Sequence, residues 1–295
     1  MRVTQQGYRK YRKNLTRPYK YAQLLADIRA IYKEDEYNNT YGRQRIYEKL
    51  RIDYECPYSY NTVYKVMKEN GLLQNLNRPK GLTEADKDAQ KSENLIKQDF
   101  TATAPNQKTV TDITEMEGIN GKLYISAIFD CYDNACLSMV MAPHMRKELV
   151  VETMKQAAMN YDLRGSVIHS DRGSQYTSEE YRVILNTIGI IQSMNGAAGR
   201  CHDNAKCESM WARAKGEIQA CYNTRKMTVE QLKTVVSGYF MDYWNHRRIC
   251  SAIGGVPPLI KRGIYYERQA DEAAQQQKRT METMEKLIHQ VVVSA

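Results

Sequence analysis

Apolar residues recur at intervals of three and four in three short stretches of the first quarter of the chain. This spacing places them on one face of a helix, so it predicts helices over 19–32, 43–51 and 62–73. Ser59 is a good N-cap for the third helix, and Gly71 is a common type of C-terminal stop. Three short helices in this order are typical of a helix-turn-helix, although they also occur as simple packing units.

From residue 108 the pattern changes to short runs rich in β-branched and aromatic residues. Three runs joined by short turns predict an antiparallel meander. Further along, stretches of helical spacing alternate with two short apolar runs that predict buried strands. The expected strands cover 108–118, 122–133, 135–143, 166–170 and 189–194, and the expected helices cover 147–161, 178–187, 204–221 and 228–246. This order predicts a mixed α/β sheet with helices on its faces.

A chain of 295 residues has room for about two domains. The residues between the two patterned regions lack clear periodicity and are punctuated by proline and glycine, as in a linker. The last segment is polar, rich in Gln and helix-prone, without a strong apolar face. We therefore expect an all-α domain over 1–80, a linker over 81–106, an α/β core over 107–262, and a polar C-terminal helix or tail over 263–295.

The positive charge is concentrated at the N-terminal end. The net charge is +9, and residues 1–80 hold 17 Lys and Arg against 8 Asp and Glu, whereas the remainder holds 26 of each sign. A basic module on a neutral body suggests binding to a polyanion, most commonly nucleic acid, although a solvated basic face has the same composition. If the module binds DNA, the third helix offers Asn61, Tyr64, Lys65 and Lys68 to a groove.

Seven cysteines are present, and none form a CxxC pair. An odd number without paired spacing argues against a disulfide framework and for a reducing compartment. The N-terminal residues contain no apolar signal-peptide core, and no run approaches the ~18–20 apolar residues of a membrane span. We therefore expect a cytoplasmic protein. Cys201, His202 and Cys207 lie close together in the sequence, but no fourth ligand has suitable spacing for zinc, which favours a structural or incidental role.

Three carboxylates occupy positions where the predicted elements would converge. Asp112 lies within the first strand, Asp171 follows the apolar strand VIH, and Glu208 lies in a predicted helix. Because sites form at strand ends in open α/β sheets, the two aspartates would be neighbours with Glu208 laid across them. Three converging carboxylates suit two Mg²⁺ ions, or Mn²⁺, which promote in-line displacement at a phosphodiester without a protein nucleophile. Any single carboxylate is more often structural, and composition alone does not separate these three from Asp130, Asp133, Asp203 and Asp242.

Four other polar residues near these carboxylates have two interpretations each. Lys215 lies two turns after Glu208 on the same helix face, where it would hold a DNA phosphate or be a solvated lysine. Arg172 would hold a phosphate or pair with a carboxylate. His169 would contact DNA or orient the site, or it would be a strand-end histidine satisfied by hydrogen bonds. Asn204 would orient Glu208 or cap the helix, and the cap is favoured.

Several strings together resemble bacterial insertion-sequence transposases with a retroviral-integrase-like core. They are TDIT (111–114), HSDRGSQYTS (169–178), SMNGAAGRCHDNAKCES (193–209) and KGE (215–217). The likeness is to OrfB, the downstream-frame product of the insertion-sequence-three family. It implies a ribonuclease-H-like fold, an acidic triad at Asp112, Asp171 and Glu208 that binds Mg²⁺, and the family's lysine at Lys215. It also implies strand cleavage at the inverted repeats of an element and strand transfer by a 3′-OH.

The sequence departs from the family pattern in two places. Between Asp171 and Glu208 lie 36 residues, one more than is usual, and the extra residue falls in the glycine-rich NGAAGRC loop, which should tolerate it. Near the end, the usual Tyr-Asn-x-x-Arg-x-His pattern has Trp244 in place of Tyr and Cys250 in place of His. The second departure puts a supporting role for that position in doubt.

The resemblance also bears on partners. Family members act on double-stranded DNA, both element ends and target, and often as a fusion with an upstream-frame product (OrfA) that supplies end recognition and a dimerising coiled coil. We therefore expect DNA, a homo-oligomer on DNA and such an upstream product or fusion as partners, in a bacterial cytoplasm. A different class is a catalytically silent DNA-binding regulator of transposition, against which the presence of all three carboxylates argues. Binding of Mg²⁺ or Mn²⁺ through the triad would discriminate between the two.

Overall fold

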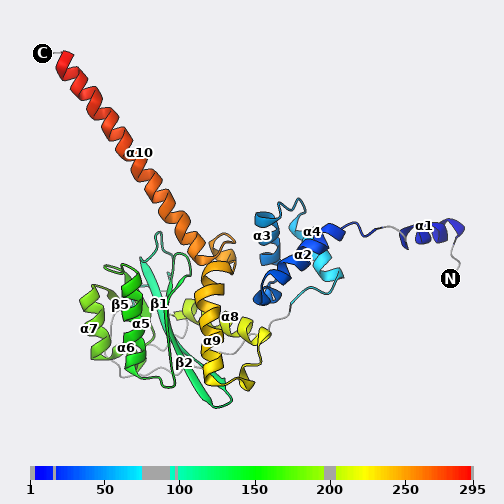
Figure 1. Cartoon of the computed structure of the whole chain (residues 1–295), viewed down its shortest axis with the longest axis horizontal. Coiled ribbons are helices and arrows are strands. Elements are labelled where there is room, and N and C mark those ends of the chain that lie inside the picture. Colours follow the sequence, from blue (N-terminus) through cyan, green and yellow to red (C-terminus); the bar gives the residue numbers. More distant parts are fainter. Residues whose placement is uncertain (1–3, 16–17, 75–93, 97–98, 196–203, 294–295) are drawn as a thin grey trace. The chain divides into compact units, whose positions relative to one another are not determined.

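The computed structural model describes residues 4–15, 18–74, 94–96, 99–195 and 204–293, with side chains as far as residue 286. The chain divides into two compact units, Met1–Leu76 and Asn77–Ala295 (Figure 1). Each unit has buried apolar residues of its own and is described by itself. Most of the expected linker lies outside the described residues.

The first unit contains the three predicted helices, α2 (Ala22–Glu34), α3 (Arg43–Asp53) and α4 (Tyr60–Glu69). Their apolar positions form its core, which contains Leu24, Ile28, Ile31, Ile46, Leu50, Val63, Val66 and Met67. The Ser59 hydroxyl accepts a hydrogen bond from the Thr62 N–H, as expected of an N-cap. The prediction of an N-terminal helical region is confirmed.

The sequence pattern predicts neither of two further short helices in this unit. α1 (Gln5–Leu15) is basic, and its residues 5–14 are exposed. η1 (Glu36–Thr40), a 3-10 helix, replaces the expected turn-rich gap. It is held by side-chain bonds, since the Asp35 carboxylate accepts the Tyr37 N–H and the Asn38 amide donates to the Ile31 carbonyl at 2.9 Å. Such local bonds lie outside what apolar periodicity detects.

The second unit is built on a five-stranded sheet in the order β3-β2-β1-β4-β5. β1 (Lys108–Gly118), β2 (Gly121–Asp130) and β3 (Cys136–Ala142) pair antiparallel, which confirms the predicted meander. β4 (Val167–Ser170) and β5 (Ile191–Met194) continue the sheet from β1 in parallel. Helices connect the parallel strands, because a parallel pair needs a crossover connection.

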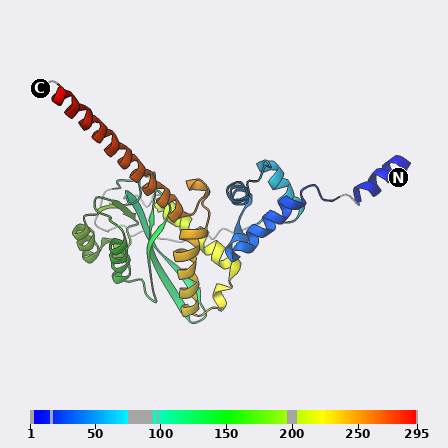
Figure 2. The same ribbon diagram turned by 45° about the horizontal axis from the view of Figure 1, so that its top comes forward.

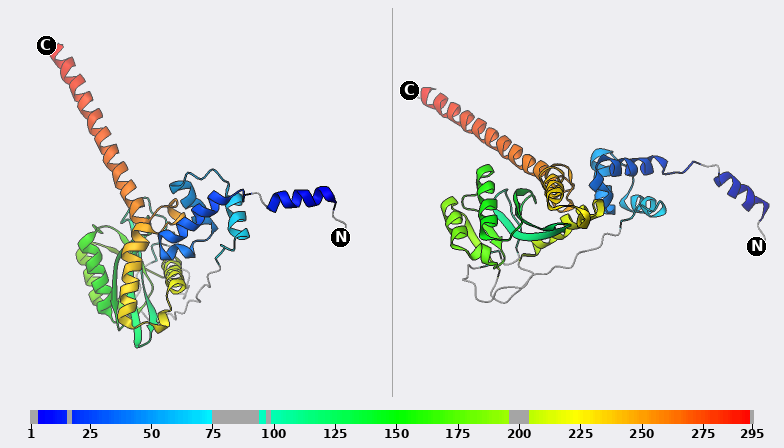
Figure 3. Two further views of the ribbon diagram at one scale, coloured as in Figure 1. Left: turned by 45° about the vertical axis from the view of Figure 1, so that its right-hand side comes forward. Right: turned by 60° about the horizontal axis from the view of Figure 1, so that its bottom comes forward.

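Helices cover both faces of this sheet (Figures 1 to 3). On one face lie α5 (Lys147–Asn160), α6 (Ser174–Thr177) and α7 (Glu179–Ile188). Their shared core contains Ile128, Met154, Ile168, Tyr176 and Leu185. The arrangement is the predicted α/β class, a ribonuclease-H-like mixed sheet flanked by helices.

The other face carries α8 (Ala205–Cys221), α9 (Val229–Ser237) and the π-helical η4 (Gly238–Arg247). An aromatic cluster joins α8 and η4 to β2, with ring centroids between 5.4 and 6.0 Å apart among Phe129, Trp211, Phe240 and Trp244. Short 3-10 turns, η3 (Thr224–Lys226) and η5 (Ser251–Ile253), complete this side.

The segment that carries Trp244 and Cys250, the two replaced positions of the family pattern, is fixed to the turn between β2 and β3 and to the start of β3. Trp244 Nε1 donates to the Asn134 carbonyl at 2.9 Å, and Asn245 bonds both backbone groups of Cys136 at 2.9 Å. The Asn134 amide donates to Cys250 Sγ at 3.4 Å. Trp244 and Cys250 are both buried, so the residues at these two positions serve the packing of the fold.

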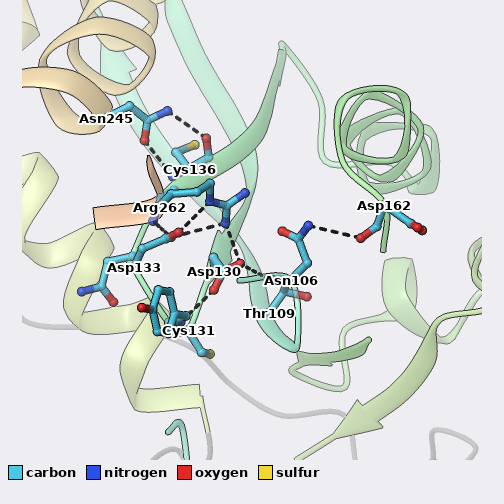
Figure 4. A network of polar contacts seen from close by, with 12 residues as sticks. Asn106, Thr109, Asp130, Cys131, Asp133, Cys136, Asp162, Asn245 and Arg262 are labelled. Carbon is cyan, nitrogen blue, oxygen red and sulfur yellow. Dashed lines mark hydrogen bonds and ion pairs between the residues drawn. The ribbon is translucent and has the colours of Figure 1, made fainter. Parts of the chain in front are cut away.

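α10 (Pro258–Val293) begins inside the range expected for the core. Arg262, near its start, donates to Asp130 at 2.7 Å and to Asp133 at 2.6 Å, and both carboxylates are fully buried (Figure 4). Burial, and then the charge of Asp133, raise the pKa of Asp130 to about 6 against the opposing effect of Arg262. Residues 267–286 are exposed. None of the helices in the described ranges has both the length and the apolar character of a membrane span.

Candidate functional site

Asp112 in β1 and Asp171, the residue that follows β4, lie at the same level of the sheet. The last register pair between β1 and β4 is Val110 and His169, and each aspartate lies two residues further along. β1 continues past this point paired with β2, where Asp112 lies opposite Ala127. The two predicted aspartates therefore meet where β4 ends, which is where sites form in sheets of this kind.

Backbone N–H groups fix the orientation of both carboxylates. Asp112 Oδ1 accepts the Ile113 N–H at 2.8 Å, and Asp171 Oδ1 accepts the Gly173 N–H at 2.9 Å. The backbone of Gly173 lies close to the Asp171 carboxylate, since a Cβ added at Gly173 would be 3.1 Å from Asp171 Oδ1. The loop after β4 thus needs a glycine to donate to this aspartate without crowding it.

The electrostatic environment opposes ionisation of the two aspartates. Burial raises the pKa of Asp112 well above its ordinary value, and the charges of Asp171 and Glu208 raise it further, whereas Lys215 lowers it. Burial also raises the pKa of Asp171, against the effect of the Gly173 hydrogen bond. The three predicted carboxylates therefore share one electrostatic site, called here the acidic site.

Glu208 lies in the first turn of α8 and is exposed. The helix is tied to β1 by Asn204, whose buried amide donates to the Thr111 carbonyl at 3.2 Å. Asn204 is the N-cap residue of α8, the position that the sequence favours for it, but its side chain makes no cap hydrogen bond to the helix. An amide that reaches another element cannot be recognised from helical position alone.

Lys215, predicted to lie on the same helix face as Glu208, is partly buried. Burial lowers the pKa of its ammonium group, and the charges of Glu115 and Asp112 act in the opposite direction. The charge of Lys215 therefore acts on Asp112, one of the three carboxylates of the acidic site.

The three carboxylates of the acidic site are not grouped tightly enough in the described structure to hold one metal ion together. Among the residues that the structure describes, no three His, Cys, Asp or Glu side chains are gathered closely enough to hold a metal ion. Cys201 and His202, weighed as zinc ligands, lie outside the described residues, and Cys207 is fully buried. The donor chemistry at Asp112, Asp171 and Glu208 is nevertheless purely carboxylate, which suits hard divalent cations.

The polar residues around the second aspartate divide into structural and accessible groups. His169 is fully buried, with its ring nitrogens 2.9 Å from Ser193 Oγ and 2.9 Å from Asn195 Oδ1, so it is a satisfied strand histidine. Arg172 is partly buried, and its Nε donates to the Asn195 carbonyl at 2.6 Å.

Sequence reasoning missed Tyr176, which lies next to both aspartates. Its hydroxyl is 3.3 Å from Thr111 Oγ1, and burial and then the charges of Asp112 and Asp171 raise its pKa well above the ordinary value. Tyr176 lies inside the HSDRGSQYTS string, and its place in this family string is the sequence feature by which it could have been recognised as a site residue.

In the first unit, α4 presents the predicted DNA-contacting residues Asn61, Lys65 and Lys68, all exposed. Lys65 has only a loose ion pair with Glu69, at 3.8 Å. Tyr64 is partly buried and lies under the Arg43 guanidinium, 5.0 Å from its ring centroid. The exposed polar face of α4 is therefore accessible within this unit, and Arg43 adds a cation that the helical pattern does not single out.

Two family models match the chain. Residues 18–80 match an HTH-like domain, which includes α2, α3 and α4. Residues 102–201 match an integrase core domain. Asp112 and Asp171 lie inside the second match, and Glu208 lies beyond its end.

Similar proteins include named bacterial transposases. The chain is 31% identical over 256 residues to the putative transposase InsK for insertion sequence element IS150 of Escherichia coli, covering 86% of this chain and 88% of that protein. It is 30% identical over 220 residues to the transposase InsF for insertion sequence IS3A of Escherichia coli, covering 74% and 75%. An uncharacterized transposase-like protein of Haemophilus influenzae is 39% identical over 168 residues, covering 57% and 76%.

Solved structures with a related fold are more distant. The catalytic core domain of BIV integrase has a TM-score of 0.40 at 18% identity, covering 57% of this chain and 99% of that chain. The HTLV-2 integrase catalytic core domain in complex with magnesium has a TM-score of 0.38 at 15% identity, covering 55% and 98%.

Proposed function

Because the chain belongs to the IS3 family of insertion-sequence transposases, we propose that it is a DDE-type polynucleotidyl transferase that cleaves and joins DNA strands at the ends of an insertion sequence. The observation that carries this proposal is the position of Asp112 and Asp171 at one level of β1 and β4, with the charges of Glu208 and Lys215 reaching Asp112. Buried carboxylates that repel one another cost stability and are typical of functional sites.

We propose that Asp112, Asp171 and Glu208 hold Mg²⁺, or Mn²⁺ in its place, as two ions. The residues fit such ions because all three offer hard oxygen donors, and because their mutual repulsion is relieved by a divalent cation. When bound, the ions would lower the pKa of a water or a 3′-OH and offset the charge on the leaving oxygen.

The chain's own residues supply position and charge. The N–H groups of Ile113 and Gly173 orient the two aspartates in advance, so little reorganisation is needed when DNA arrives. Lys215 contributes a partly buried cation that we assign to a DNA phosphate near the scissile bond. We assign the Arg172 guanidinium, anchored through its Nε, to a second phosphate.

We propose that Asn61, Lys65 and Lys68 bind DNA from α4, with Asn61 at the helix start facing bases and the lysines facing phosphates. We assign DNA binding to the domain over residues 1–80 and catalysis to the core over residues 107–262. Residues 81–106 form the linker between these two domains, and residues 263–295 form the C-terminal helix. The protein would act in a bacterial cytoplasm as a homo-oligomer on double-stranded DNA, with an upstream-frame product or as a fusion with it.

A circle-formation assay in cells tests the proposal. A plasmid carries the DNA ends that flank the gene, and the chain is supplied alone, with the upstream frame, and as Asp171→Asn or Glu208→Gln. We expect joined circles, and we expect either variant to reduce them by more than the roughly 10–100-fold that outer-shell changes at metal sites cause. The matched controls, Asp162→Asn and Glu282→Gln, change exposed carboxylates and should keep activity.

A catalytically silent regulator is the competing function. It is favoured by the spacing of the three carboxylates, which in the described structure are not grouped closely enough to hold one metal ion together. A regulator would bind the element ends but form no circles under any of these conditions. It would also show no stabilisation by Mg²⁺ that depends on Asp171. Ends bound without circles, even with the upstream frame, would therefore replace the transferase proposal.

A further inference from the structure

Asn204 joins the start of α8 to β1 beside the acidic site. Its Nδ2 donates to the Thr111 carbonyl at 3.2 Å, and Thr111 immediately precedes Asp112. In the other direction, Glu208 lies four residues after Asn204, about one helical turn along α8. One hydrogen bond thus connects the strand that carries one proposed ligand to the helical turn that carries another.

The amide of Asn204 is poorly suited to a purely structural role. The residue is 2% exposed, and its Oδ1 has no hydrogen-bond partner in the described part of the chain. Burying an unsatisfied carbonyl oxygen destabilises the folded state. An apolar side chain of similar size would avoid that cost but lose the bond to the Thr111 carbonyl, so the two effects on stability oppose each other and stability alone does not explain an asparagine here.

We propose, on the premise that the acidic site binds Mg²⁺, that Asn204 is a positioning residue that holds Glu208 at the level of Asp112. Its bond fixes the first turn of α8 against β1. The remainder of the helix stays docked without this bond, because Met210, Trp211 and Ile218 are buried. Loss of the bond therefore lets the first turn shift and weakens cation binding, because outer-shell contacts orient metal ligands.

The same turn of α8 offers a matched control. Lys206 Nζ donates to the Cys131 carbonyl at 3.0 Å, which ties the helix to the end of β2 and not to the strand of Asp112. Lys206→Met removes this bond and keeps the aliphatic stem. It loosens the same helical turn without breaking the contact to Thr111.

The test uses the full chain and Mn²⁺ as the probe, with free Mn²⁺ measured by its electron paramagnetic resonance signal. Thermal unfolding is recorded separately in EDTA. We expect Asn204→Leu and Asn204→Ala to weaken Mn²⁺ binding by about tenfold. In EDTA, Asn204→Leu should unfold at a Tm close to that of the unchanged chain, because removing the unsatisfied oxygen offsets the lost bond to the Thr111 carbonyl. Lys206→Met should bind Mn²⁺ as the unchanged chain does.

Unchanged Mn²⁺ affinity in Asn204→Leu overturns the inference. So does equal weakening by Lys206→Met, which would show that any loosening of the helix start has the same effect. A lower Tm in EDTA for Asn204→Leu would assign Asn204 a structural role instead. Failure of the proposed function gives a different result. In that case the unchanged chain and Asp171→Asn would bind Mn²⁺ equally weakly, and the role of Asn204 would be rejected together with the metal site.

Discussion

Asp171, the residue that follows β4, raises the pKa of Asp112 on the neighbouring strand β1, and its charge adds to the larger effect of burial. A carboxyl group whose pKa is raised on folding destabilises the folded protein once it is ionised, so this cost is present at neutral and alkaline pH and disappears at low pH. The two residues are therefore arranged for a function at the expense of stability.

Asp112→Asn should make the protein more stable in the absence of metal. The amide removes the buried charge, and we expect the Tm at pH 8 in EDTA to rise by about 2–4 °C. The control is Asp162→Asn, because hydrogen bonds from Arg164 lower the pKa of Asp162 to about 2, so its loss should not raise the Tm. A lower Tm for Asp112→Asn would mean that the ionised carboxylate stabilises the fold.

Binding of Mg²⁺ should strengthen as pH rises. Burial, Asp171 and Glu208 all raise the pKa of Asp112, so this carboxyl keeps its proton to higher pH than an ordinary aspartate and must lose it to bind a cation. Calorimetric titrations in two buffers of different ionisation enthalpy should show proton release on binding, and Asp112→Asn should release fewer protons, because the pKa of Asp171 is raised as well. Identical heats in both buffers would contradict the expected coupling.

Gly173→Ala should impair activity without unfolding the protein. The new methyl would lie 2.9 Å from Gln175 Oε1 and 3.1 Å from Asp171 Oδ1, so the flexible Gln175 yields and the carboxylate is displaced. We expect circle formation to fall by about tenfold, the size of other outer-shell effects. Gly216→Ala is the matched control, because its Cβ meets nothing within 4 Å and alanine favours the α8 helix. Equal activity in the two variants would show that Asp171 tolerates the displacement.

The ion pair between Arg248 and Glu217 should stabilise the fold without taking part in chemistry. Arg248 Nη2 lies 2.7 Å from Glu217 Oε1, the two side chains are 1% and 0% exposed, and Tyr239 donates to the same carboxylate. Arg248→Met leaves the buried Glu217 carboxylate without its cation, and it should lower the free energy of unfolding, measured in urea, by about 3–5 kcal/mol. Adding Glu217→Gln should restore part of that loss, and no recovery would indicate that packing of the arginine, not charge, dominates.

Lys65 and Lys68 should contribute to DNA affinity through phosphates. Replacing both with Gln should weaken binding to all sequences alike, and it should reduce the slope of log K against log salt by about 0.9 for each phosphate that a lysine had neutralised. The control changes Lys278 and Arg279 to Gln, an exposed pair of the same charge on α10. An unchanged slope for the α4 variant would place the DNA surface elsewhere.

Local patterns in the sequence were sufficient for the elements that bury one apolar face. Spacings of three and four located α2, α3 and α4, and short β-rich runs located β1, β2 and β3 in the correct antiparallel order. Both signals are local, because burial of one face imposes a period on the residues that form it. η1 was missed because it depends on single side-chain bonds that have no period.

By itself, the sequence determined the sheet strands, the helices with an apolar face, the family, and the choice of Asp112, Asp171 and Glu208, since these are carried by periodicity and by recognisable strings. Only the tertiary structure decided that Asn204 ties α8 to β1, that His169 is a buried structural residue, and that Tyr176 borders the acidic site. These contacts join residues between 24 and 93 positions apart. A periodic pattern shows that a face is buried, but it does not show which side chain on another element it meets, because that depends on how the elements pack.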